Sequence, residues 1–159
     1  MSGVGDKERI TQNRVIKLFT EKLGYRYLGN WHERENNNNI EEEILRSYLN
    51  KKGYNEELIN RAVEQLIKTA NNQVDKLYYV NKEVYTLLRY GAQVKENTGD
   101  NKETVKFINW EEPYDNDFYI AEEVSIKGEN KKRPDIVLYV NGIALGVLEI
   151  KRSTVYVSE

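Results

Sequence analysis

Two segments near the C-terminal end of the sequence carry residues that could bind a metal ion. Pro134 and Asp135 open one apolar run, and Glu149, Ile150 and Lys151 close the next. Along a strand, Glu149 and Lys151 would share one face while Ile150 turns to the other. Charged side chains that close an apolar strand are costly to desolvate unless they have a partner. We therefore interpret Asp135 and Glu149 as candidate metal ligands.

The chemistry of such a site would be phosphodiester hydrolysis. Two carboxylates and the backbone carbonyl of Ile150 are hard oxygen ligands of the kind that suits Mg²⁺. The ion lowers the pKa of a bound water and stabilises charge on a phosphoryl oxygen. Lys151 would position or help to deprotonate that water, and would offset charge in the transition state. The alternative is a surface salt pair, because short motifs of this kind also occur by chance.

The composition excludes several other catalytic classes. The 159 residues include no cysteine and a single histidine, His32, so thiolate zinc sites, cysteine nucleophiles and histidine-based triads are essentially ruled out. No apolar run is long enough to span a membrane, and no secretory signal is visible. The net charge is −2, whereas a domain that binds nucleic acid alone is usually basic. The chain therefore either does not bind nucleic acid or relies on partners to hold it there.

The elements that must position this site follow from hydrophobic periodicity. Helical spacing predicts helices over residues 8–23 and 40–52, a third helix capped by Asn55, and a short fourth capped by Asn81 that ends near residue 90. We expect a frayed terminus over residues 1–7 and a polar loop over 29–39. The remaining β-rich runs predict strands over residues 25–28, 92–95, 104–110, 119–127, 135–140 and 143–151. This order predicts a single α/β or α+β domain over residues 1–159, with a mostly antiparallel or mixed central sheet flanked by helices.

The hairpin that joins the two motif segments has a register that can be predicted. Asn141-Gly142 is a strong signal for a two-residue turn. A strict turn of that length would pair Asp135 with Leu148 and leave Asp135 and Glu149 on opposite faces. A shared metal ion needs them on one face. We therefore predict either a three-residue turn over residues 140–142 or a bulge further along the hairpin.

The stretch RPDIVLYVNGIALGVLEIK, residues 133–151, resembles the PD-(D/E)xK nuclease signature in the N-terminal domain of the restriction (R) subunit of type I restriction-modification enzymes. The segment NDFYIAEEVSIKG, residues 116–128, is similar to the strand before that family's catalytic hairpin. The resemblance implies a restriction-endonuclease-like core and a type I site-specific deoxyribonuclease activity. The implied reaction is Mg²⁺-dependent hydrolysis of double-stranded DNA. Other defence or repair nucleases of this fold, and a non-catalytic docking module, remain alternatives.

The resemblance also implies roles for individual residues. Asp135 and Glu149 would be metal ligands and Lys151 the catalytic lysine. Glu8, on the first helix, resembles the acidic residue that this fold often adds to its site, although a helix carboxylate is more commonly solvated or placed against the helix dipole. The basic run Lys131, Lys132 and Arg133 is either a solvated loop or a set of phosphate contacts beside the metal.

The resemblance further implies a set of partners. It suggests a prokaryotic, cytoplasmic complex with methylation and specificity subunits, in which ATP drives a motor region of the same R subunit. The sequence contains no GxxxxGK[ST] phosphate loop, so we expect the motor to be absent from this chain. The family's Gln-x-x-x-Tyr element, which follows the catalytic lysine, is also absent before Glu159. We therefore interpret the chain as a fragment of a larger R subunit.

Overall fold

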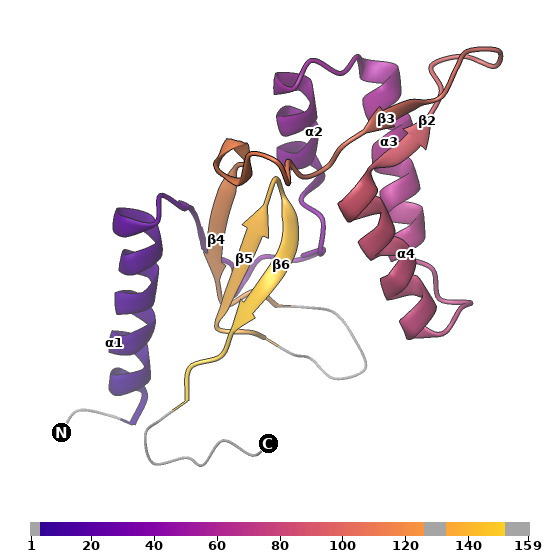
Figure 1. The fold of residues 1–159 in the computed structure, drawn as a ribbon. Helices are drawn as coiled ribbons and strands as arrows, with labels where there is room; N and C mark the ends of the chain where they lie inside the picture. Colours follow the sequence, from indigo (N-terminus) through magenta and orange to yellow (C-terminus); the bar gives the residue numbers. More distant parts are fainter. Residues whose placement is uncertain (1–3, 126–132, 152–159) are drawn as a thin grey trace. The chain divides into compact units, whose positions relative to one another are not determined.

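The computed structural model describes residues 4–125 and 133–151, which fall into two compact units (Figure 1). The sheet unit is drawn from Met1–Asn39, Phe118–Val140 and Ala144–Glu159, and the helical unit from Ile40–Asp117 and Asn141–Ile143. Helices and a mixed β-sheet confirm the predicted α/β class. Among the described residues, no helix combines the length and the apolar character needed to cross a membrane.

The sheet unit contains a four-stranded mixed sheet. Its strands are β1 (Arg26–Asn30), β4 (Phe118–Glu122), β5 (Ile136–Val140) and β6 (Ile143–Leu148). The order is β1-β4-β5-β6, with β1 parallel to β4 and β4 antiparallel to β5. Ala121 lies opposite Val137, and Tyr119 lies opposite Tyr139. Their side chains share one face, and the apolar core of the unit forms there.

Helix α1 (Val4–Lys17) begins earlier than the sequence predicts. The predicted start was Glu8, because the apolar pattern begins only at Ile10. Polar residues can form a first helical turn without burying anything, so periodicity alone does not mark the start. The chain continues as a short π-helix, η1 (Leu18–Lys22), and turns at Gly24, whose φ of 73° suits glycine.

The β5–β6 hairpin turns on two residues and not three. Asn141 and Gly142 have φ values of 52° and 86°, as a type I′ turn requires. The predicted three-residue turn is therefore wrong. Gly146 nevertheless lies beside Leu138 on one face, since a Cβ built on Gly146 would be 3.4 Å from the Leu138 Cβ. A strict two-residue hairpin would pair Leu138 with Leu145. This proximity is compatible with the alternative bulge, and the shifted register itself stays a prediction.

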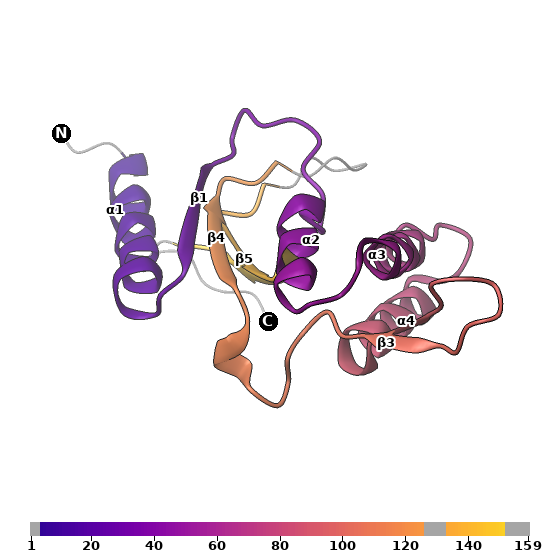
Figure 2. The same cartoon turned by 90° about the horizontal axis from the view of Figure 1, so that it is seen from above.

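The helical unit is built from three helices and a small hairpin. These are α2 (Glu42–Lys51), α3 (Glu56–Ala70), α4 (Leu77–Tyr90), the antiparallel strands β2 (Ala92–Val94) and β3 (Glu103–Val105), and the 3₁₀ turn η2 (Pro113–Asp115). Helices α3 and α4 run side by side (Figure 2). The fully buried core residues of this unit include Leu45, Leu49, Ala62, Val63, Leu66, Val105 and Phe107.

Two helix caps were predicted in this unit, and one is correct. The side chain of Asn55 caps α3 by accepting a hydrogen bond of 3.0 Å from the backbone N–H of Leu58. Asn81 is not a cap, because α4 already begins at Leu77. Val80 is buried and lies on the same helix face as Val84, so core packing favours helix well before Asn81.

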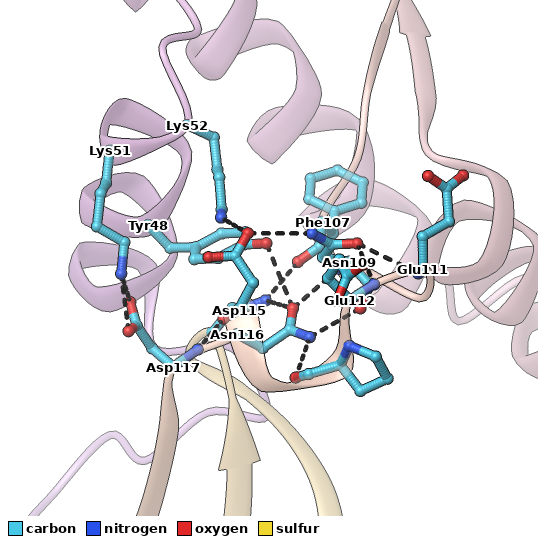
Figure 3. A network of polar contacts seen from close by, with 12 residues as sticks. Tyr48, Lys51, Lys52, Phe107, Asn109, Glu111, Glu112, Asp115, Asn116 and Asp117 are labelled. Carbon is cyan, nitrogen blue, oxygen red and sulfur yellow. Dashed lines mark hydrogen bonds and ion pairs between the residues drawn. The ribbon is translucent and has the colours of Figure 1, made fainter.

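A buried asparagine network explains why the predicted strand over residues 104–110 ends at Val105 (Figure 3). The backbone N–H of Asn109 donates to the side chain of Asn116 (2.8 Å), and the carbonyl of Phe107 accepts from the side chain of Asn141 (2.9 Å). Asn141 also donates to Asn116 (2.8 Å) and accepts from the backbone of Asp117 (2.7 Å). Backbone groups after Val105 are therefore satisfied by side chains and need no strand partner.

Candidate active site

The structure brings the two halves of the motif together in the sheet unit. Asp135 precedes β5 and is half-buried. Its carboxylate Oδ2 accepts a hydrogen bond of 2.6 Å from the backbone N–H of Ile150, which lies between Glu149 and Lys151. The backbone carbonyl of Asp135 accepts another, of 2.9 Å, from Glu123. Asp135 is thus fixed at the point where β5 begins and β6 has just ended.

Glu149 and Lys151 both follow β6 and are exposed, whereas Ile150 is half-buried between them. This alternation is the one that the sequence predicts. Among residues 4–125 and 133–151, no three carboxylate or histidine side chains form a cluster that could hold a metal ion. The roles of Asp135, Glu149, Ile150 and Lys151 in a metal site therefore stay predictions.

The residues present fit a magnesium ion by their chemistry. One oxygen of Asp135 receives the Ile150 N–H, and a carboxylate has a second oxygen that can bind a cation. Glu149 adds an exposed carboxylate two residues before Lys151. Proteins commonly hold Mg²⁺ by only one or two carboxylates, with waters and substrate phosphates completing the octahedron. Asp135 and Glu149 would be sufficient for that mode.

Glu8 lies on α1, one turn before Gln12 and on the same helix face. Its side chain is half-buried. The N-terminal end of α1 lies at the end of the sheet where β5 begins and β6 ends (Figure 1). The membership of Glu8 in a metal site stays a prediction.

A buried carboxylate that sequence reasoning missed lies beside the motif. Glu122, the last residue of β4, has a side chain only 4% exposed. It accepts hydrogen bonds from Arg9 Nη1 (3.0 Å) and Gln12 Nε2 (2.8 Å), and from the hydroxyl of Tyr27. The one available signal was a glutamate that continues the apolar strand over residues 118–121.

The hydroxyl of Tyr27 stays protonated across the neutral range. Partial burial raises the pKa of Tyr27 to about 12, and the hydrogen bond to Glu122 and the charge of that carboxylate add to the rise. The hydroxyl is therefore a permanent donor to Glu122. The carboxylate of Glu122 thus accepts hydrogen bonds from side chains of both α1 and β1.

An open groove of about 540 Å³ lies on the same unit next to the motif. Its walls include Arg9, His32, Arg34, Glu123 and Arg133. Arg133 pairs with Glu123 (2.9 Å) and contacts Nδ1 of His32 (2.5 Å). Of the predicted phosphate contacts, Arg133 thus lines a groove, while Lys131 and Lys132 lie outside the described residues.

A comparison of the sequence against known families gives the family of the chain. Residues 6–159 match the family described as the type I restriction enzyme R protein N terminus. The chain therefore belongs to this family, and its mixed sheet with flanking helices is consistent with a restriction-endonuclease-like fold.

Two curated relatives are named as endonuclease subunits of type I restriction enzymes, one of them as putative. The chain is 32% identical over 102 residues to the type I restriction enzyme HindI endonuclease subunit of Haemophilus influenzae. It is 29% identical over 99 residues to the putative type I restriction enzyme MjaVIIIP endonuclease subunit of Methanocaldococcus jannaschii. The matched stretches cover 61% and 62% of this chain, but only 10% and 9% of the relatives.

Proposed function

We propose that this chain is the nuclease domain of a type I restriction R subunit and that it cleaves double-stranded DNA with Mg²⁺. The observation that carries the proposal is the hydrogen bond from Ile150 N–H to the carboxylate of Asp135. This bond joins the two halves of the motif at one point of the sheet. Family membership and the names of the two curated relatives support the same function.

In this proposal Asp135 and Glu149 hold the ion, with the carbonyl of Ile150 and with Glu8 as a further ligand. When bound, Mg²⁺ lowers the pKa of a water molecule and stabilises negative charge on the phosphoryl oxygens. Lys151 is exposed, so its ammonium can reach the scissile phosphate. There it helps to deprotonate the attacking water and offsets charge in the transition state.

The rest of the proposal concerns DNA and protein partners. Arg133 and the groove that it lines contact the phosphate backbone, together with Lys131 and Lys132. Since the net charge of the chain is −2, most of the electrostatic grip on DNA comes from other parts of the assembly. We assign that role to the ATP-driven motor region of the R subunit and to the methylation and specificity subunits.

Substitution of Asp135 or Lys151 by alanine in the full-length R subunit tests this function. We expect DNA cleavage by the assembled enzyme, with ATP and Mg²⁺, to fall at least about 100-fold for either variant, because a charge at the reacting centre is lost. ATP hydrolysis should remain, which shows that the assembly has formed. Lys95→Ala, an exposed lysine of the helical unit, is the matched control and should cleave normally. Unchanged cleavage by Asp135→Ala would favour a non-catalytic docking module.

A further inference from the structure

Helix α1 presents a buried polar side chain to the sheet. Of its described side chains, from Lys7 onward, only that of Gln12 is buried. The apolar residue Ile10 is 58% exposed, Val15 and Ile16 are half-buried, and no described residue of α1 belongs to the buried cluster of Ala121, Val124, Val137 and Tyr139. A helix on a sheet normally buries an apolar stripe. Over residues 7–17 of α1, two apolar side chains are half-buried, and the one that is fully buried is a polar amide.

The partners of this amide converge on the end of β4 and the start of β5. Gln12 Nε2 lies 2.8 Å from Glu122 Oε2, 3.2 Å from Glu123 Oε1 and 3.5 Å from the backbone carbonyl of Asp135. The first contact is a strong charge-assisted hydrogen bond and the last is at the limit of one. A single side chain of α1 is therefore in contact with two carboxylates and with the backbone of Asp135.

The surrounding charges make a hydrogen-bond donor favourable at this position. Glu122 and Glu123 are consecutive carboxylates, and Glu123 has a strained φ of 53°. Arg9, one turn from Gln12, pairs with Glu122, and Arg133 pairs with Glu123. Each carboxylate thus has a cation on one side and shares the amide of Gln12 on the other. An apolar residue at position 12 would leave Oε2 of Glu122 with the Arg9 donor but without its shorter hydrogen bond.

We propose that Gln12 is a positioning residue for the metal site, and that its contact with Glu122 fixes α1 against the strand end that carries Asp135. The inference rests on the proposed function, since it assumes that Asp135 binds the ion. Glu8 lies one turn before Gln12 on the same face, so the same contact sets how close Glu8 comes to Asp135. Partners that orient metal ligands typically contribute about 10- to 100-fold to metal affinity or activity.

The test compares Gln12→Leu with Asn13→Leu in the full-length R subunit. Asn13 is the exposed neighbour on the same helix, so its variant controls for any general effect of the substitution. We would measure Mn²⁺ binding by electron paramagnetic resonance, and the Mg²⁺ dependence of kcat and KM for DNA cleavage. Gln12→Leu should weaken Mn²⁺ binding about tenfold and lower kcat with KM for DNA unchanged. Asn13→Leu should match the wild type in both measurements.

The two proposals fail in different ways. Wild-type Mn²⁺ binding by Asp135→Ala would overturn the metal site itself. Loss of binding in Asp135→Ala together with wild-type binding in Gln12→Leu would overturn only the positioning role.

A pair of exchanged side chains keeps the test decisive if Gln12→Leu does not fold. Gln12→Glu alone sets three carboxylates against one another and should lose Mn²⁺ binding. Adding Glu122→Gln restores one amide donor facing one carboxylate and should recover most of the binding. A double variant that is no better than Gln12→Glu would overturn the proposal.

Discussion

At the scale of single residues, the sequence identifies the motif but not what holds it. Asp135, Glu149 and Lys151 stand out because charges close apolar strands within a stretch of about twenty residues. Gln12 and Glu122 do not stand out, because their contact joins positions 110 apart in the chain. A glutamine on a helix looks like a solvent-facing residue until the sheet beneath it is known. Only the fold reveals that it is the buried side chain among residues 7–17 of its helix.

Asn141 offers a prediction at the same scale. Its side chain is fully buried, accepts from Asp117 N–H and donates to Asn116 and Phe107. Asn141→Asp removes both donors, places a carboxylate against two acceptors and should lower the free energy of unfolding by about 2–4 kcal/mol. Urea unfolding measures this, and exposed Asn101→Asp is the control. A shift of similar size in both variants would contradict the assigned hydrogen bonds.

At the scale of elements, the sequence places most helices and strands but not their ends. The Asn55 cap is right because it depends on one local hydrogen bond. The Asn81 cap is wrong because burial of Val80 favours a helix that begins five residues earlier, at Leu77. The length of the hairpin turn follows from the Asn141-Gly142 pair. The shift in strand pairing beyond the turn was predicted because a shared metal ion needs Asp135 and Glu149 on one face. The contact that Gly146 makes with Leu138 joins two strands, so no local pattern encodes it.

The hairpin turn gives an element-scale prediction. A Cβ at Gly142 would lie 2.6 Å from the carbonyl of Glu41 and 3.0 Å from Ile44, and its φ is 86°. Gly53 has a similar φ of 88° but open space around it. Gly53→Ala should therefore cost only backbone strain, about 1 kcal/mol, while Gly142→Ala should cost at least about 2 kcal/mol more. Thermal unfolding measures the stability of both variants. Equal losses of stability would show that the turn tolerates a side chain at Gly142.

At the scale of the whole chain, composition limits the function without identifying it. The absence of cysteine and the single histidine leave carboxylate and lysine chemistry, which agrees with the motif. The division into two units was not foreseen, because residues 40–117 form an ordinary sequence of helices with no boundary signal such as a proline-rich linker. Their separate core becomes visible only from which apolar side chains meet.

Net charge gives a prediction at this scale. A chain of charge −2 releases few counterions when it meets DNA, so non-specific affinity should be low. We expect the 159-residue chain alone to bind a fluorescent DNA duplex with a Kd weaker than about 10⁻⁴ M at physiological salt. Fluorescence anisotropy measures this Kd for the isolated chain and for the assembled enzyme, so that the two values can be compared. Micromolar binding by the isolated chain would show that the surface of this chain, including the Arg133 groove, is sufficient to bind DNA.

The hairpin tip has a practical consequence for anyone who dissects this protein. Residues 141–143 pack with residues 40–117, while the strands on either side of them belong to the other unit. The backbone therefore passes from one unit to the other four times, and no single truncation point separates them. A recombinant fragment cut at residues 40 and 117 would lack the Asn141 amide that Asn116 accepts from. A fragment that contains the whole helical unit would have to include residues 141–143 joined to residues 40–117.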